Sequence, residues 1–162
     1  MLHCTDGLFL ETAREMAAGY PALEFDDRML DAACYLLVRQ PSLFEVMVLP
    51  NQYGDIISDL VAGLVGSLGL APGANFGPEA AVFEASHGAA PDIAGRGIAN
   101  PIALILSGAM LLDHLNEDQA AARVRRAVAA VLRDRQALTP DLGGSGSTGS
   151  LSEAICREVA GG

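Results

Sequence analysis

The chain contains no lysine, and its 10 basic residues are all arginines. Against 20 acidic residues, this leaves a formal net charge of -10 at neutral pH. Proteins that bind nucleic acid present basic surface patches, so the composition argues against a nucleic-acid partner. An arginine-rich stretch at residues 123–135 is interpreted as the solvated face of a helix. An anionic substrate would therefore need positive charge from a metal, from helix termini or from another chain.

Long apolar runs are also missing. Hydrophobic residues make up 51% of the chain, but no run approaches the roughly 18 apolar residues of a membrane-spanning helix. The most apolar stretch, residues 102–115, is interrupted by Ser107, Gly108 and Asp113. We therefore expect no membrane partner. The excess of apolar side chains instead indicates an oligomer interface.

Cysteine is scarce as well. The three cysteines, at positions 4, 34 and 156, lack the spacing of zinc sites, redox motifs or disulfide frameworks. Such usage is typical of a reducing compartment, and Met1 leads into a polar segment rather than a signal peptide. We therefore expect a cytoplasmic protein whose thiols are packing or surface groups.

Hydrophobic periodicity and turn residues predict an α/β fold with three or four strands in an incomplete sheet. The apolar helices at 27–39 and 53–66 are expected to be largely buried, in a core or between subunits. The Gly- and Pro-rich segments 69–78, 87–101 and 138–150 are expected to be loops. The remaining predicted elements are helices at 5–19, 101–115, 118–135 and 151–159 and strands at 45–49 and 81–85.

Three carboxylates stand out among the apolar helices. Asp55 and Asp59 share one face of the predicted helix at 53–66. Two buried like charges repel each other unless a cation such as Mg²⁺ or Mn²⁺ joins them. Asp31 is a single acid in an apolar helix and needs a partner of its own. Spacing alone leaves an alternative open, in which Asp55 caps its helix, Asp59 faces solvent and Asp31 pairs with an arginine.

The sequence around these carboxylates resembles the isocitrate and 3-isopropylmalate dehydrogenase family. Its metal motif matches NQYGDIISD at 51–59, and its cofactor motif matches FEASHGAAPDIAGRGIANP at 83–101. The likeness continues in TDGLF at 5–9, AGLVGSLGLAPGAN at 62–75 and TPDLGG at 139–144, and so covers essentially the whole chain.

The resemblance implies the C-terminal half of that family's fold, an incomplete mixed sheet flanked by helices. Residues 1–65 would form part of the small domain, with the dimer-interface helices and the metal aspartates. Residues 66–162 would form the C-terminal part of the large domain, with the NAD-binding loop.

The resemblance also implies a role for each motif residue. Asp55 and Asp59 would bind Mg²⁺ or Mn²⁺ in their own subunit, and Asp31 would reach the metal site of the partner subunit. Asp92 takes the position that selects NAD, because a carboxylate accepts hydrogen bonds from ribose hydroxyls and repels a 2′-phosphate. The other implied NAD-binding residues are Glu84, His87, Gly88, Ala89, Ala90, Pro91, Ile93, Gly95 and Asn100, with His87 and Asn100 beside the adenine.

The implied reaction is the NAD- and metal-dependent oxidative decarboxylation of a 2-hydroxy-3-carboxy acid. The segments TDGLFLE and APGAN look more like those of isocitrate and homoisocitrate enzymes than like those of 3-isopropylmalate enzymes. Isocitrate is the expected substrate, with homoisocitrate and 3-isopropylmalate as alternatives. In the family, the catalytic lysine and tyrosine precede the segment that matches residues 5–9. We therefore expect no catalytic residue in this chain and no activity from it alone.

The expected partners are a small-molecule substrate and either a second copy of the chain or a complementing N-terminal polypeptide. Two alternatives to a truncated dehydrogenase remain open at this stage. The chain could be one half of a split enzyme, or a non-catalytic subunit that binds nucleotide or metal. The segment GGSGSTGS at 143–150 lacks the lysine of a Walker motif and is interpreted as a flexible loop beside the adenine site.

Overall fold

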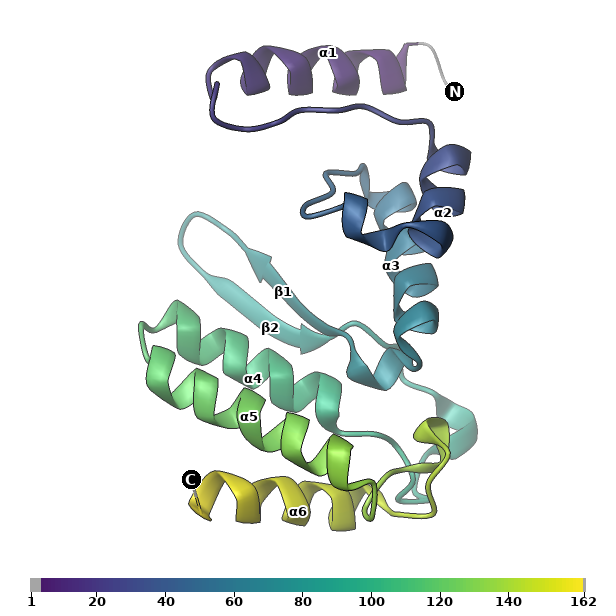
Figure 1. The fold of residues 1–162 in the computed structure, drawn as a ribbon, viewed down its shortest axis with the longest axis vertical. Coiled ribbons are helices and arrows are strands. Elements are labelled where there is room, and N and C mark those ends of the chain that lie inside the picture. Colours follow the sequence, from purple (N-terminus) through teal and green to yellow (C-terminus); the bar gives the residue numbers. More distant parts are fainter. Residues whose placement is uncertain (1–3, 162) are drawn as a thin grey trace. The chain divides into compact units, whose positions relative to one another are not determined.

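The computed structural model describes residues 4–161 and contains two compact units, Met1–Val61 and Ala62–Gly162 (Figure 1). The described chain is rich in helices and carries one sheet of two strands. The predicted α/β class is confirmed, whereas the expectation of three or four strands is wrong. None of the described helices is both long and apolar enough to cross a membrane.

The first unit consists of helices joined by irregular segments. Helix α1 (Thr5–Ala18) buries none of its residues. Helix α2 (Leu30–Arg39) begins three residues later than predicted, because Met29 is still extended. A 3-10 turn, η1 (Pro41–Leu43), and helix α3 (Asn51–Val65) follow, and the boundary between the two units falls inside α3.

Burial of α2 and α3 in a core is not found within the described chain, and their burial between subunits stays a prediction. Only Ala33, Leu37, Ile57 and Ala62 are buried on these two helices. Large apolar side chains are exposed instead, including Tyr35 at 64%. The sequence pattern reports which faces are apolar, but nothing within the described chain covers them.

The predicted strand at 45–49 is also wrong. The segment is irregular, and Val46 and Val48 are exposed. A β-branched run forms a strand only when another strand accepts its backbone hydrogen bonds. No strand in the described part of the chain pairs with this segment.

The second unit begins with the 3-10 turn η2 (Leu68–Leu70) and an antiparallel hairpin. Strand β1 (Pro72–Phe76) pairs with β2 (Ala81–Ala85). The bounds of β2 are those predicted from the sequence, whereas β1 lies in a segment predicted to be a loop. Pairing with β2 imposes the extended conformation on residues whose Gly and Pro content favours a turn.

Three helices pack in order beside the hairpin. Helix α4 (Ile102–His114) contacts both strands and α5 (Asp118–Asp134), and α5 contacts α6 (Thr148–Gly161), as Figure 1 shows. The hairpin and α5 both cover α4, so its sequence is apolar on most sides. The remaining regular elements are the short 3-10 turns η3 (Pro91–Ile93) and η4 (Pro140–Leu142).

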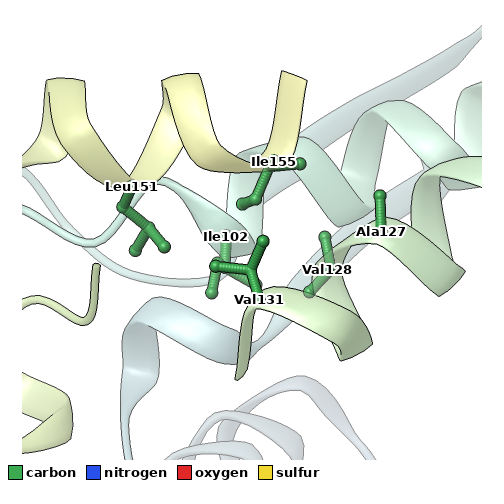
Figure 2. Close-up of a cluster of buried hydrophobic side chains, with 6 residues drawn as sticks. All are labelled: Ile102, Ala127, Val128, Val131, Leu151 and Ile155. Carbon is green, nitrogen blue, oxygen red and sulfur yellow. The ribbon is translucent and has the colours of Figure 1, made fainter. Parts of the chain in front are cut away.

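The core of the second unit lies where the three helices meet. Figure 2 shows its six buried side chains, Ile102, Ala127, Val128, Val131, Leu151 and Ile155. The opposite face of α5 carries exposed arginines, which confirms the interpretation of that stretch as a solvated helix face. One of them, Arg125, holds Asp113 of α4 through two hydrogen bonds.

Candidate functional site

The carboxylates of the first motif lie near the start of α3. The helix begins at Asn51, so Asp55 sits in its second turn and does not cap it, against the alternative left open above. Asp55 and Asp59 are exposed rather than buried as predicted, so Asp59 faces solvent as in that alternative, and their spacing places both on one side of the helix. Within residues 4–161, no ion pair involves either carboxylate. Two exposed carboxylates without ion-pair partners, held on one helix, can supply part of the oxygen ligands of a hard cation.

Asp31 lies in the first turn of α2 and is exposed. Its Oδ1 accepts a hydrogen bond from the backbone N–H of Ala32, 2.8 Å away. No arginine within the described residues pairs with it, again unlike the alternative reading. The same residues form no group of three His, Cys, Asp or Glu side chains that could hold a metal. Asp31 therefore does not complete a site with Asp55 and Asp59 inside one chain.

Tyr53, in the same motif, contacts α1. Its hydroxyl lies 3.3 Å from both carboxylate oxygens of Asp6 and donates to them. The negative charge of Asp6, with smaller contributions from burial and from the hydrogen bond, raises the pKa of the Tyr53 phenol. The phenol therefore stays protonated at neutral pH and acts as a hydrogen-bond donor here. The sequence motif gave no sign of Asp6 as its partner.

The cofactor motif forms an irregular segment from Ser86 to Pro101 in the second unit, called the cofactor segment below. Ala90 adopts the left-handed conformation (φ 43°) just before η3 begins. Gly95 and Gly97 also have positive φ, and a Cβ built on either would meet no atom within 4 Å. The backbone there is open to close approach by a ligand.

The polar side chains of the cofactor segment are exposed. Asp92 lies in the first turn of η3, and no ion pair in the described chain involves it. The ring of His87 is exposed, with Nδ1 3.0 Å from the carbonyl oxygen of Gly88. The predicted cofactor residues Gly88, Ala89 and Pro91 are exposed beside them, and Ile93 is half-buried. These groups are available to a ligand without the breaking of an internal salt bridge.

Glu84 is placed by the hairpin and by α4. Its Oε1 accepts a hydrogen bond of 2.9 Å from the side chain of Asn75 on β1. Its backbone carbonyl accepts one of 2.6 Å from the hydroxyl of Ser107, which is fully buried on α4. The carboxylate remains exposed, on a strand whose backbone is fixed to the helix below it.

Asn100, at the other end of the cofactor segment, is only 7% exposed. Its Nδ2 donates to Oδ2 of Asp141 at 3.0 Å, and its Oδ1 accepts from the backbone N–H of Ile102 at 3.0 Å. Both ends of the side-chain amide are thus engaged within the protein. A contact between Asn100 and an adenine would therefore involve its backbone or the second amide hydrogen.

Asp141 accepts a second hydrogen bond, of 2.5 Å, from Ser67 to the same carboxylate oxygen. Burial alone would raise the pKa of Asp141, but hydrogen bonds, chiefly those from neighbouring side chains, outweigh it and lower the pKa below its usual range. Asp141 is therefore ionised at neutral pH. Sequence reasoning assigned no role to Ser67 or Asp141, although the Pro-Asp pair at 140–141 is a turn signal.

The segment at 143–150 is firmly held, so the prediction of a flexible loop is wrong. The backbone N–H of Gly146 donates to the carbonyl of Leu138 at 2.8 Å. Thr148 ties the segment to the cofactor segment, because its N–H donates to the carbonyl of Gly97 at 2.8 Å and its hydroxyl to that of Ala99 at 2.6 Å. Thr148 was also missed from sequence, since its contacts are distant along the chain.

Comparisons with known proteins identify the family to which the chain is similar. The sequence model of the isocitrate/isopropylmalate dehydrogenase family matches residues 1–158. The chain is 53% identical over 159 residues to an isocitrate/homoisocitrate dehydrogenase of Thermus thermophilus, covering 98% of this chain and 47% of that protein. It is 50% identical over 156 residues to the mitochondrial NAD isocitrate dehydrogenase catalytic subunit 5 of Arabidopsis thaliana, covering 96% of this chain and 42% of the relative.

A solved structure gives the same result. The crystal structure of isocitrate dehydrogenase from Methylococcus capsulatus superposes with a TM-score of 0.94 at 53% sequence identity, covering 98% of this chain and 47% of that one. The chain thus spans less than half the length of these relatives. With nearly all of its residues matched in sequence and in structure, the chain belongs to the isocitrate/isopropylmalate dehydrogenase family.

Proposed function

We propose that this chain supplies the metal- and NAD-binding part of an enzyme that oxidatively decarboxylates a 2-hydroxy-3-carboxy acid, with isocitrate as the favoured substrate. The observation that carries the proposal is the pair of exposed aspartates on α3, which form no ion pair with any described residue, in a member of this family. The substrate class is supported by the names of the relatives, which act on isocitrate or homoisocitrate.

Asp55 and Asp59 would hold the metal, and Asp31 of a second copy would complete the ligand set. A bound Mg²⁺ or Mn²⁺ supplies a Lewis acid that stabilises negative charge developing on substrate oxygens. The two α3 carboxylates would hold the metal ion in position. The helix sets their spacing, and both lie open to ligand. Oxygen ligands of this kind suit either cation.

Asp92 would select NAD over NADP. Its exposed carboxylate can accept hydrogen bonds from ribose hydroxyls, and its charge disfavours a 2′-phosphate. The open backbone around Gly95 and Gly97 would allow the adenosine to approach closely. His87 is exposed and would pack beside the adenine.

Proton transfer needs groups that we do not assign to this chain. It contains no lysine, and the hydroxyl of Tyr53 already donates to the carboxylate of Asp6. We propose that the lysine and tyrosine implied by the family come from the part of the relatives that this chain does not match. Alone, the chain would bind Mn²⁺ and NAD without turnover.

Joining the chain to the unmatched N-terminal part of the Thermus thermophilus relative should yield NADH from NAD and isocitrate in the presence of Mn²⁺. Asp55→Asn in this fusion should lower activity by more than about tenfold, because even groups that only support metal ligands contribute that much. Asp134→Asn removes the same charge from an exposed position and should have no effect.

NADH formation is followed by its absorbance, with the unfused chain as a second control. Robust turnover by the unfused chain, verified by intact mass, would contradict the division of roles. A folded fusion that binds Mn²⁺ and NAD but does not oxidise isocitrate would favour a non-catalytic binding subunit.

The exposed apolar faces of α2 and α3 lead us to expect a dimer at micromolar concentration. Tyr35, Val38 and Ile56 are all at least half exposed, and burying one such side chain stabilises association by about 1.5–3 kcal/mol. Ile56→Asp should raise the dimer dissociation constant by at least about tenfold. Leu115→Asp, exposed at the end of α4, is the matched control. Light scattering that finds a parent monomer would contradict this expectation.

A further inference from the structure

Three polar side chains from distant segments meet where the cofactor segment enters α4. One carboxylate oxygen of Asp141 accepts hydrogen bonds from Ser67 at 2.5 Å and from Asn100 at 3.0 Å. The other end of the Asn100 amide accepts from the N–H of Ile102, one of the donors that a helix start leaves without an intrahelical partner. Asn100 therefore links η4 to the first turn of α4.

Packing leaves Asn100 little freedom to turn away. A Cβ built on Gly69 would lie 2.7 Å from the Cβ of Asn100, so the η2 backbone is in close contact with this side chain. Just upstream, Thr148 holds the carbonyls of Gly97 and Ala99. The last residues of the cofactor segment are thus held from two directions, by Thr148 and by the carboxylate of Asp141.

The Asp141 carboxylate is the group on which this arrangement depends. Hydrogen bonds to an ionised acceptor are roughly twice as strong as those between neutral groups. Without that acceptor, the buried Nδ2 of Asn100 would lose its one partner among residues 4–161 and would favour rearrangement toward water. The far end of the same amide would then release the helix start.

We propose that Asp141 is a positioning residue for NAD binding, which acts through Asn100 to hold the C-terminal end of the cofactor segment in its binding conformation. Asp141 need not touch the cofactor for this. The inference rests on the proposed function, because it takes the cofactor segment to be the NAD site. It adds two residues, Ser67 and Asp141, that lie outside the motif itself.

The test compares the parent chain with Asp141→Ala, Asn100→Asp and the double variant N100D/D141N. Asp141→Ala should raise the Kd for NAD, measured by calorimetry, about tenfold, as expected from loss of a hydrogen bond to a charged acceptor. Asn100→Asp should also raise the Kd for NAD, because it places a second carboxylate opposite that of Asp141. In the double variant, donor and acceptor exchange places, and the Kd should return to within about threefold of the parent.

Hydrogen exchange, measured without NAD, reports the segment directly. Amides of residues 86–101 should exchange faster in Asp141→Ala, while the Mn²⁺ affinity stays at the parent value. Asp134→Asn is the control that removes one exposed charge. If Asp141→Ala does not fold, Ser67→Ala carries the same exchange and Kd measurements; it removes one bond to the carboxylate and also the hydrogen bond that the Ser67 hydroxyl accepts from the N–H of Gly69.

Unchanged exchange in residues 86–101 on loss of the Asp141 acceptor would overturn the positioning role. A double variant that binds NAD no better than Asn100→Asp would overturn it too. A parent chain that does not bind NAD would overturn the proposed cofactor site instead, and the exchange measurement would still decide whether Asp141 positions the segment.

Discussion

Leu151→Ala should lower the free energy of unfolding of the second unit by about 3 kcal/mol, within the range of roughly 2–5 kcal/mol for buried leucines. Leu151 is fully buried on α6 and is one of the six core side chains in Figure 2. Removing its side chain would leave a cavity between α6 and its neighbours, which the surrounding structure closes only in part. The loss is large beside a typical domain stability of about 5–15 kcal/mol.

Leu104→Ala is the matched control, since it makes the same chemical change at a position of α4 that is 61% exposed. We expect an effect within about 0.5 kcal/mol for such a surface site. The chain contains no tryptophan, so urea unfolding is best followed by circular dichroism, with hydrogen exchange of α4–α6 as a local readout. Equal losses for both leucines would contradict the core as described.

The helices of the second unit illustrate what a sequence can predict. The bounds of α4 and α5 agree with the prediction to within one residue, because Pro101 and the acids at 117–118 mark helix starts. The strand β2 was predicted at its observed bounds from a short apolar run. These signals are local, and the contacts of each element within the unit support them.

Predictions that needed knowledge of a partner failed. The run at 45–49 has strand-like residues but no strand to pair with among those described. Strand β1 was missed because its Gly and Pro favour a turn until β2 aligns beside it. The apolar faces of α2 and α3 predicted burial in a core or between subunits; the core is not found in the described chain, and the interface stays a prediction.

The candidate site likewise contains residues that the sequence motifs identify and residues that only the fold brings together. The motifs identified the candidate metal ligands Asp31, Asp55 and Asp59 and the candidate NAD-selecting residue Asp92, and the structure leaves all of these side chains exposed. The supports of the cofactor segment were not visible, because Ser67 and Asp141 are 74 residues apart in sequence. No pattern of period 2 or 3.6 connects such positions. Only the fold shows that both ends of the Asn100 side-chain amide form hydrogen bonds within the protein.

Gly144→Ala should destabilise the second unit by about 3 kcal/mol, at the upper end of the range for overpacking. A Cβ at this position would lie 2.0 Å from the carbonyl oxygen of Leu138, far inside van der Waals contact. The obstacle is backbone, which cannot rotate aside as a side chain can. Relief requires the segment to move away, with loss of the hydrogen bonds from Gly144 to Thr139 and from Gly146 to Leu138.

Gly149→Ala is the control, made five residues further along the same segment. Its Cβ would meet only the hydroxyl of Ser147, at an ordinary 3.8 Å, and the residue lies in the first turn of α6. Alanine is favoured over glycine in helices by roughly 0.5–1 kcal/mol, so this variant should be slightly more stable than the parent. If urea unfolding shows a loss of stability for Gly144→Ala and a gain for Gly149→Ala, the segment at 143–150 is closely packed and can support the cofactor segment. A flexible loop would tolerate both alanines alike, since neither would meet a fixed backbone.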